Sequence, residues 1–477
     1  MFLRVASAAA FALGLLAPRP AAGNGRLPGA SQLVFSVSPG TAGVAVLRTT
    51  FGILVSRDAG ATWDWVCEAA IPGLQSGVDP AIGLTANGTL VATVFPGLDL
   101  STDTGCSWRA SGCPFRGLLA VDVAVRPDAL HAVVAVVSSP TASSGTKGAS
   151  ACPSASFDGG EGLFDNRVIE SRDDGAHWAA LGASLDPGVV ITTIDVAATD
   201  PHRVYASAFR EVADGDGGAA REASLFVSYD DGAHWTEQRA PLDRANESAV
   251  FIAAVDPADA DRVYLRTAGG PRSPSRLLVT RDAGRTFESP LTLTGPMLGF
   301  ALSGDGATVH AGSVENGLFA APRASLAFEK RSAIAVTCLA TNGADLWACS
   351  TEQSGFLAGV SRDDGATFTP KLHLCSLRGA LSCPAGASAA QCSASFDFLD
   401  KGFGCRSDAG VADVDTGGVA AAPAVPSPGA PRGSCGCSAA SRADLAGLLA
   451  PAALTAALAW RRARARGGRG APGRSVF

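Results

Sequence analysis

Three arginines are the first candidates for chemistry in this sequence. Arg48 and Arg266 each lie in a Leu-Arg-Thr context near the end of a predicted second strand of a repeat, and Arg210 ends the equivalent strand of another repeat. The planar guanidinium group matches the geometry of carboxylates and phosphates. If the strands bring these side chains together, they could line a site for an anionic ligand; otherwise they are solvated surface residues.

Three aspartates outside the repeated motifs, Asp122, Asp195 and Asp256, lie in or beside predicted hairpins. A pair of carboxylates at a suitable separation could act as acid and base, or as acid and nucleophile, on a glycosidic bond. No pair is distinguished by its sequence context, and polarity at a turn or strand edge explains each residue more simply. We therefore assign no catalytic residue from the sequence.

The elements that would position these residues are indicated by an eight-residue motif, here called the repeated turn. The Ser and Asp side chains of this motif can accept hydrogen bonds from its own N–H groups, and its Gly supplies a positive φ. The ring at its end is expected to turn inward and fill space between sheets. The six copies are S-R-D-A-G-A-T-W from Ser56, S-T-D-T-G-C-S-W from Ser101, S-R-D-D-G-A-H-W from Ser171, S-Y-D-D-G-A-H-W from Ser228, T-R-D-A-G-R-T-F from Thr280 and S-R-D-D-G-A-T-F from Ser361. A structural role is therefore expected for Asp58, Asp103, Asp173, Asp230, Asp282 and Asp363.

A second pattern, two apolar runs around a turn, precedes each repeated turn. The clearest examples are 194–209 and 252–267, where Asp-Pro separates runs rich in β-branched residues. A decayed seventh repeat keeps only the nine-residue spacing between Phe319 and Phe328. Two successive hairpins make four antiparallel strands, and the repeats recur at intervals of about 40 to 70 residues, as propeller blades do. The sequence thus predicts an all-β, seven-bladed β-propeller of four-stranded antiparallel blades over residues 24–374.

The repeated turn resembles the Asp-box, or bacterial neuraminidase repeat, of sialidases, sortilin-type receptors, xyloglucan-cleaving glycosidases and photosystem assembly factors. The resemblance covers roughly residues 33–371. It implies that each turn joins the third and fourth strands of a blade, away from the active face. The residues of a sialidase site are not visible, because the Arg-Ile-Pro signature is missing. Of the three tyrosines, Tyr205 and Tyr264 hold repeat positions and Tyr229 lies in a turn.

The two ends of the chain predict export and attachment to the cell surface. Residues 1–23 combine Arg4, an apolar run and a small-residue site, which is the pattern of a cleaved signal peptide. Residues 435–477 carry two cysteines, an apolar segment at 445–460 that predicts a short hydrophobic helix, and an arginine cluster. This order resembles the C-terminal sorting tails of myxobacterial surface proteins, which implies processing at Cys435 or Cys437. A permanent membrane anchor is the alternative, and 406–434 is expected to be a flexible linker.

The 12 cysteines, ten of them before the tail, favour an oxidising compartment. Cys338 and Cys349 are equidistant from the turn at 342–345, so they should face each other across a hairpin and form a disulfide. A Cys-rich cap is expected over 375–405, which holds Cys375, Cys383, Cys392 and Cys405. The sequence leaves open the partners of Cys67, Cys106, Cys113 and Cys152.

The charge of the chain excludes one class of partner. The net charge is −6, and the arginine-rich tail leaves the rest of the chain more acidic still, whereas nucleic-acid binding requires a basic face. Two acidic glycine-rich stretches, 214–218 and 413–418, have the spacing of calcium ligands but lack the terminal Glu of a complete calcium loop. We therefore expect no nucleic-acid partner, no metal and no cofactor, and a monomeric protein.

Insertions interrupt the repeat in two neighbouring blades, at 138–166 and 210–222. Both lengthen the connection from a second to a third strand, opposite the repeated turns, where scaffold loops commonly carry binding residues. The candidate residues on these loops are Asp158, Glu161, Asp165, Arg210, Asp214 and Asp216. The sequence thus predicts a surface-anchored binding or adhesion module for an extracellular glycan or protein. The alternatives are a glycoside hydrolase on the same fold and an assembly factor for another envelope protein.

Overall fold

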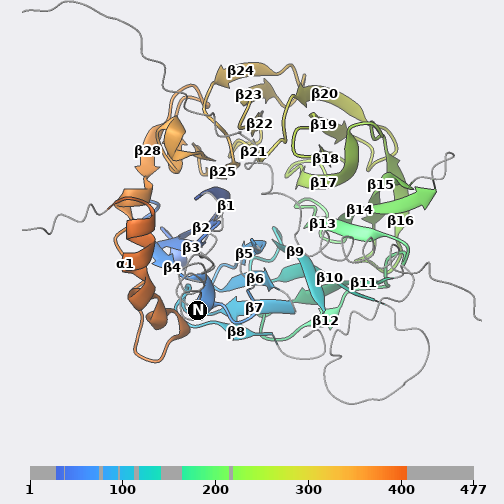
Figure 1. Ribbon diagram of the computed structural model, residues 1–477. Helices are drawn as coiled ribbons and strands as arrows, with labels where there is room; N and C mark the ends of the chain where they lie inside the picture. Colours follow the sequence, from blue (N-terminus) through green and yellow to red (C-terminus); the bar gives the residue numbers. More distant parts are fainter. Residues whose placement is uncertain are drawn as a thin grey trace, which may run out of the picture.

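The computed structural model describes residues 28–36, 38–74, 79–94, 97–111, 118–140, 164–213 and 219–405. They form seven four-stranded antiparallel sheets, each built from four consecutive strands and arranged as blades around a centre (Figure 1). The predicted all-β, seven-bladed propeller is therefore confirmed. The signal peptide, the linker and the tail with Cys435 and Cys437 lie outside the described residues, as do the loop residues Asp158, Glu161, Asp214 and Asp216.

The strands follow one another through the blades in chain order. Blade one is β1 (Ala30–Phe35), β2 (Ala45–Thr49), β3 (Gly52–Ser56) and β4 (Asp64–Val66), and blade two is β5 (Ile82–Leu84), β6 (Leu90–Val94), β7 (Gly97–Ser101) and β8 (Arg109–Ala110). Blade three is β9 (Leu119–Val125), β10 (Val133–Pro140), β11 (Phe164–Ser171) and β12 (Ala179–Ala180), and blade four is β13 (Val190–Val196), β14 (Val204–Ala213), β15 (Ala219–Ser228) and β16 (Thr236–Ala240). Blade five is β17 (Glu247–Val255), β18 (Val263–Gly269), β19 (Ser275–Thr280) and β20 (Glu288–Leu293). Blade six is β21 (Gly299–Leu302), β22 (Thr308–Ser313), β23 (Gly317–Pro322) and β24 (Glu329–Ser332), and blade seven is β25 (Cys338–Asn342), β26 (Asp345–Cys349), β27 (Ala358–Ser361) and β28 (Thr369–Leu372).

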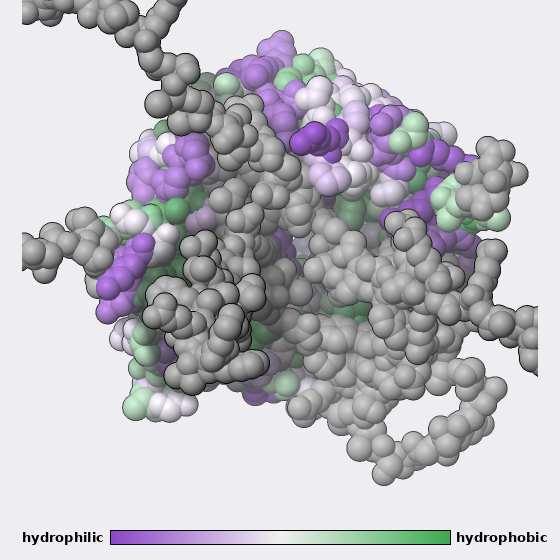
Figure 2. Space-filling model, in the orientation of Figure 1, coloured by the Kyte–Doolittle hydropathy of each residue, from purple (hydrophilic) through white to green (hydrophobic). Residues whose placement is uncertain are grey.

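The first strand of every blade lies nearest the centre, so β1, β5, β9, β13, β17, β21 and β25 line the middle of the ring, here called the central channel (Figure 1). Because neighbouring strands are antiparallel, the repeated turns and the first-to-second connections leave one face of the ring, here called the turn face. The second-to-third connections leave the opposite face, here called the loop face. Hydrophilic side chains, in purple in Figure 2, lie over the outer strands at the top of the ring.

The repeated turn has the hydrogen bonds that its sequence predicts. In blade one, Ser56 Oγ accepts a bond from the Gly60 N–H at 2.8 Å, and Asp58 Oδ1 accepts one from the Thr62 N–H at 2.8 Å. The same two bonds recur in all six copies at 2.7–2.9 Å. Gly60 has a φ of +84°, and a Cβ there would lie 2.5 Å from the ring of Trp347 in blade seven. A side chain at this position would therefore strain both the turn and the contact between blades one and seven.

The expected burial of the turn rings holds fully only in the first two blades. Trp63 and Trp108 are 1% and 6% exposed, because the segment after β28 covers them. The rings of the other five blades are partly exposed at the turn face, namely Trp178, Trp235, Phe287, Phe328 and Phe368. The decayed repeat nevertheless forms a complete blade, β21–β24.

The covering segment is a clasp that runs from blade seven across blades one and two. Its residues 379–381 lie beside the outermost strand of blade one: the Trp65 N–H donates to Gly379 O, and the Leu381 N–H donates to Trp65 O, each at 2.8 Å. Helix α1 (Ser393–Gly402) follows and packs Phe396 against Trp65. No helix in the part of the chain that the structure describes is long and apolar enough to cross a bilayer.

Four disulfides are present among the described residues. The predicted Cys338–Cys349 disulfide joins β25 to β26, whose two cysteines pair directly in the strand register. Cys375–Cys405 lies within the clasp. The other two fasten the clasp to the ring: Cys67–Cys392 to blade one and Cys106–Cys383 to blade two. The expected Cys-rich cap is thus bonded to distant blades as well as to itself.

The insertion in blade four is mostly regular strand, where a loop was expected. Strands β14 and β15 stay paired as far as Ala213 and Ala219, so the hairpin extends past the end of the repeat. In blade three, β10 and β11 likewise stay paired as far as Pro140 and Phe164. Backbone pairing continues in both cases because the extra residues of the two strands remain in register.

Candidate functional site

Four of the charged residues singled out in the sequence converge in the central channel. Arg48 and Arg266 lie on the second strands β2 and β18, and Asp122 and Asp195 lie on the innermost strands β9 and β13. The charge of Arg48 acts on both Arg266 and Asp122, and Asp122 is also in the field of Asp195. Residues from blades one, three, four and five therefore form one charged group, here called the channel cluster.

Arg48 is held at the boundary between blades one and two. Its Nε donates to Ser31 Oγ at 2.9 Å, and its Nη1 donates to Pro80 O at 2.9 Å. Pro80 lies two residues before the innermost strand of blade two. These bonds fix the guanidinium close to the channel, where its charge acts on Arg266 and Asp122.

Arg266 has much weaker local partners. Its Nη1 donates to Met297 O over 3.5 Å, and its guanidinium carbon lies 4.6 Å from the centre of the Phe251 ring. Among the described residues, no carboxylate forms an ion pair with it. Burial and the charge of Arg48, opposed by Asp122, lower the pKa of Arg266 to about 10. The group stays cationic at neutral pH, so most of its donors are available to a ligand.

The two channel aspartates link neighbouring blades through the backbone. Asp122 Oδ2 accepts a hydrogen bond from the Ile194 N–H of blade four at 3.0 Å. Asp195 accepts bonds from the Val196 N–H at 2.8 Å and from the Val255 N–H of blade five at 3.2 Å. Burial raises the pKa of Asp122 to about 7 and that of Asp195 to about 6, although these N–H groups favour the ionised forms.

A cavity of about 160 Å³ adjoins the cluster. Ser31, Gln32 and Arg266 make its polar side, and the rest of the wall is largely apolar. The apolar residues come from blades one, five, six and seven, namely Leu33, Ile252, Ala253, Leu298, Phe300 and Leu339. Its size suits one small group of a ligand, since complete small-molecule sites usually exceed about 300 Å³.

The raised pKa of Asp122 makes protein stability depend on pH in a defined direction. Its pKa is higher in the folded chain than in the unfolded chain, so its contribution is complete below about pH 4 and is lost as pH rises through about 7. In Asp122→Asn this loss disappears. Relative to wild type, the free energy of unfolding of the variant should therefore increase between about pH 5 and about pH 8, by on the order of 2–3 kcal/mol. Urea unfolding at the two pH values measures this, and a pH-independent difference would contradict it.

The aspartates of the repeated turns behave in the opposite way. The side-chain bond from His177 holds the pKa of Asp173 at about 2, and bonds from His234 and Thr367 do the same for Asp230 and Asp363. These carboxylates stay ionised in the pH range of the experiment. They are therefore poor candidates for a catalytic acid and do not disturb the measurement on Asp122.

Two of the predicted loop-face residues do not reach the channel cluster. Arg210 forms ion pairs with Asp186, in the segment before β13, at 3.3 Å and with Glu237 of β16 at 2.6 Å. Asp165 lies in β11 and pairs with Arg167 at 2.9 Å. Arg210 is therefore not grouped with Arg48 and Arg266, because its guanidinium is already paired with two nearby carboxylates.

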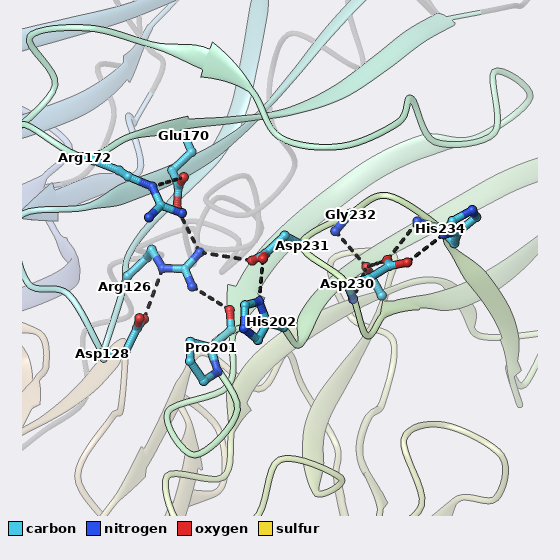
Figure 3. A network of polar contacts seen from close by, with 11 residues as sticks. Arg126, Asp128, Glu170, Arg172, Pro201, His202, Asp230, Asp231, Gly232 and His234 are labelled. Carbon is cyan, nitrogen blue, oxygen red and sulfur yellow. Dashed lines mark hydrogen bonds and ion pairs between the residues drawn. The ribbon is translucent and has the colours of Figure 1, made fainter.

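The sequence did not reveal the ion networks that join blades at the turn face. Asp256 is fully buried and accepts two bonds from Arg323, at 2.5 and 2.8 Å, across the boundary of blades five and six. Arg126 holds the equivalent position between blades three and four, where V-R-P replaces V-D-P. Its guanidinium donates hydrogen bonds to Asp128, Glu170 and the Pro201 carbonyl oxygen and lies 4.0 Å from an Asp231 carboxylate oxygen (Figure 3). In the decayed repeat, Arg323 stands where the other repeated turns have Asp. This substitution was the sequence feature that could have identified the Asp256–Arg323 pair.

The described part of the chain contains no group of three or more His, Cys, Asp or Glu side chains placed to hold a metal ion. The channel cluster also mixes cations with carboxylates, which favours binding of a charged organic group over a metal. The arrangement can thus bind an anion at Arg266, or exchange a proton at Asp122 and Asp195.

No protein family model matches this sequence, and no curated protein matches it either. Among solved structures, the chain is similar to an ancestral GH74 enzyme, with 13% identity and a TM-score of 0.46 over 72% of this chain and 49% of that one. It is also similar to the extracellular domain of a one-component system from B. thetaiotaomicron, with 10% identity and a TM-score of 0.41 over 68% and 37% of the two chains. A third similar structure is the GH74 xyloglucanase from Xanthomonas campestris, with 15% identity and a TM-score of 0.33 over 74% and 65%. This chain spans half or less of the first two proteins, and the similarity is one of fold between distant proteins.

Proposed function

We propose that this protein is an exported, surface-attached binding module that holds an anionic group of an extracellular glycan or protein in its central channel. The observation that carries the proposal is the environment of Arg266. This residue lines the cavity, makes one long hydrogen bond and has no ion pair among the described residues. A carboxylate or phosphate would supply the missing acceptors, and charge-assisted bonds of this kind are the strong ones.

Four disulfides support the exported location, since such bonds persist in oxidising compartments. Attachment to the membrane through the C-terminal tail, and cleavage of the signal peptide, belong to the same proposal. They rest on the sequence patterns of residues 435–477 and 1–23. The acidic character of the chain also supports a site-specific contact with an anion over general attraction to polyanions such as nucleic acids.

Binding of the purified protein to a panel of acidic and neutral envelope polysaccharides and proteins tests the proposal. Arg266→Gln should weaken binding of the acidic ligands at least about tenfold, because it removes the charge that the ligand neutralises. The matched control is Arg362→Gln, which removes an exposed cation paired with Asp345 and should leave binding unchanged. Equal binding of neutral and acidic polymers, or unchanged binding by Arg266→Gln, would contradict the proposal.

A glycoside hydrolase is the second candidate, and one observation favours it. Asp122 and Asp195 share the channel and both have raised pKa values, as a general acid requires. Their backbone bonds to neighbouring blades support a structural role instead. Hydrolysis of fluorogenic glycosides that is abolished in both Asp122→Asn and Asp195→Asn would make the enzyme the better proposal.

A further inference from the structure

The cavity that Arg266 lines is formed where two innermost strands bulge. The register of β1 with β2 shifts at Ser31, and the register of β17 with β18 shifts at Ala253. Both bulged residues line the cavity. A bulge redirects a side chain out of the regular alternation of a strand, and bulges are common beside binding sites. Strands β1, β17, β21 and β25 lie around this part of the channel (Figure 1).

Three polar side chains line the cavity, and they differ in the hydrogen bonds that they already make. The Gln32 amide is engaged with Ile82, since its Nε2 donates to Ile82 O and its Oε1 accepts from the Ile82 N–H, each at 3.0 Å. Ser31 Oγ accepts a bond from Arg48 Nε at 2.9 Å, so the Ser31 proton is left to donate. Arg266 makes one hydrogen bond of 3.5 Å. The side-chain donors that a ligand can use therefore belong to Arg266 and Ser31.

The other side chains of the cavity are apolar or, at Cys338, part of a disulfide. Leu298 and Phe300 of blade six and Ile252 of blade five are partly exposed there. These side chains offer no hydrogen bond, so an oxygen held against them would lose its hydration without replacement. A cavity of about 150 Å³ with walls of Leu, Ile and Phe holds a benzene ring. This cavity has about 160 Å³, so an apolar group of that size or smaller fits.

We propose that the anionic group held at Arg266 is a carboxylate with a small apolar substituent on the neighbouring carbon. The planar carboxylate matches the fork of one guanidinium, and the Ser31 hydroxyl donates to one of its oxygens. The substituent then contacts Leu298 and Phe300. Sulfate or phosphate fits less well, because its further oxygens would face apolar side chains. The inference rests on the proposed function, because it names the ligand class of the same site.

The test uses the full protein and four small probes: acetate, 2-methylpropanoate, 2-methylpropanamide and sulfate. 2-Methylpropanoate should bind about tenfold more tightly than acetate, because two more carbon groups leave water. Sulfate and the neutral amide should both bind at least about tenfold more weakly than 2-methylpropanoate, sulfate because of its further oxygens and the amide because it lacks the charge. Titration calorimetry, or the rise in melting temperature with probe concentration, measures each affinity.

Two variants of blade six test the apolar wall. Leu298→Asn should reduce the preference for 2-methylpropanoate over acetate from about tenfold to about twofold, since a polar amide replaces part of the wall. The matched control is Leu302→Asn, a partly exposed position of β21 outside the cavity lining, which should keep the preference. Ser31→Ala should weaken binding of both carboxylates by a similar factor, because both use its hydroxyl.

The outcomes separate this inference from the proposed function. Equal affinities for acetate, 2-methylpropanoate and sulfate, all lost in Arg266→Gln, would overturn the inference and leave the anion site in place. Binding of the amide as tight as that of the carboxylate, or anion binding that Arg266→Gln does not weaken, would overturn both. The comparison of the four probes needs only the wild-type protein, so the inference stays testable if a variant unfolds.

Discussion

Replacement of both Cys67 and Cys392 with alanine is expected to lower the free energy of unfolding by about 4–5 kcal/mol. This disulfide joins residues 325 positions apart and fastens the clasp across blade one. Each blade is built from consecutive strands, so within the described part of the chain no strand exchange joins blades seven and one. Blades seven and one also pack directly, with the Phe35 and Trp347 ring centroids 5.2 Å apart, and the clasp adds a covalent fastening to this packing. Denaturant unfolding measures the loss, and hydrogen exchange should accelerate in blades one and seven.

The matched control is the Cys338→Ala, Cys349→Ala double variant. Its disulfide spans only 11 residues within one hairpin, so its removal should cost less, about 2–3 kcal/mol, and should leave the clasp in place. Trp63 provides a local readout, because the clasp buries it almost completely. If both double variants lost equal stability and Trp63 stayed protected in both, the clasp would not be what stabilises the junction of blades one and seven.

Removal of the fully buried carboxylate from the Asp256–Arg323 pair, whose arginine is half-buried, is the second large expected effect. Asp256→Ala should lower the free energy of unfolding by about 3–5 kcal/mol, since the variant strands a guanidinium at the boundary of blades five and six. The Tyr264 hydroxyl, which donates to Asp256 Oδ2 at 3.0 Å, also loses its acceptor. Thermal or urea unfolding gives the value directly.

The control for this pair is Asp345→Ala, which breaks the Arg362–Asp345 ion pair of blade seven. The Arg362 side chain is 79% exposed, so water replaces its partner and the cost should be within about 1 kcal/mol. Similar losses in the two variants would show that the Asp256–Arg323 contact does not hold blades five and six together.

The repeated turn and the hairpin disulfide could be predicted because the interactions that specify them join residues close together in the sequence. The repeated turn contains its own donors and acceptors, so Ser56, Asp58 and Gly60 specify one conformation wherever the pattern occurs. The hairpin disulfide follows from the same reasoning, as Cys338 and Cys349 are equidistant from one turn.

The channel cluster could not be predicted in this way. Its members lie on four blades, and their convergence depends on closure of the ring. Strand irregularities add to the difficulty: the register shifts between Val136 and Val137 opposite β9, and between Ile191 and Thr193 in β13. Each shift changes which side chains face the channel, so simple alternation along the strand fails.

The number of blades, their four strands and the hydrogen bonds of the repeated turn could be read from the sequence, because short-range hydrogen bonds and alternating apolar residues encode them. The cysteines that fasten the clasp, the rings that it covers and the charges that share the channel became visible only in the folded protein. Those relations join residues from blades far apart in the chain. They exist only once seven sheets have packed around a common centre, where burial raises the pKa of Asp122 and Arg266 forms no ion pair with another described residue.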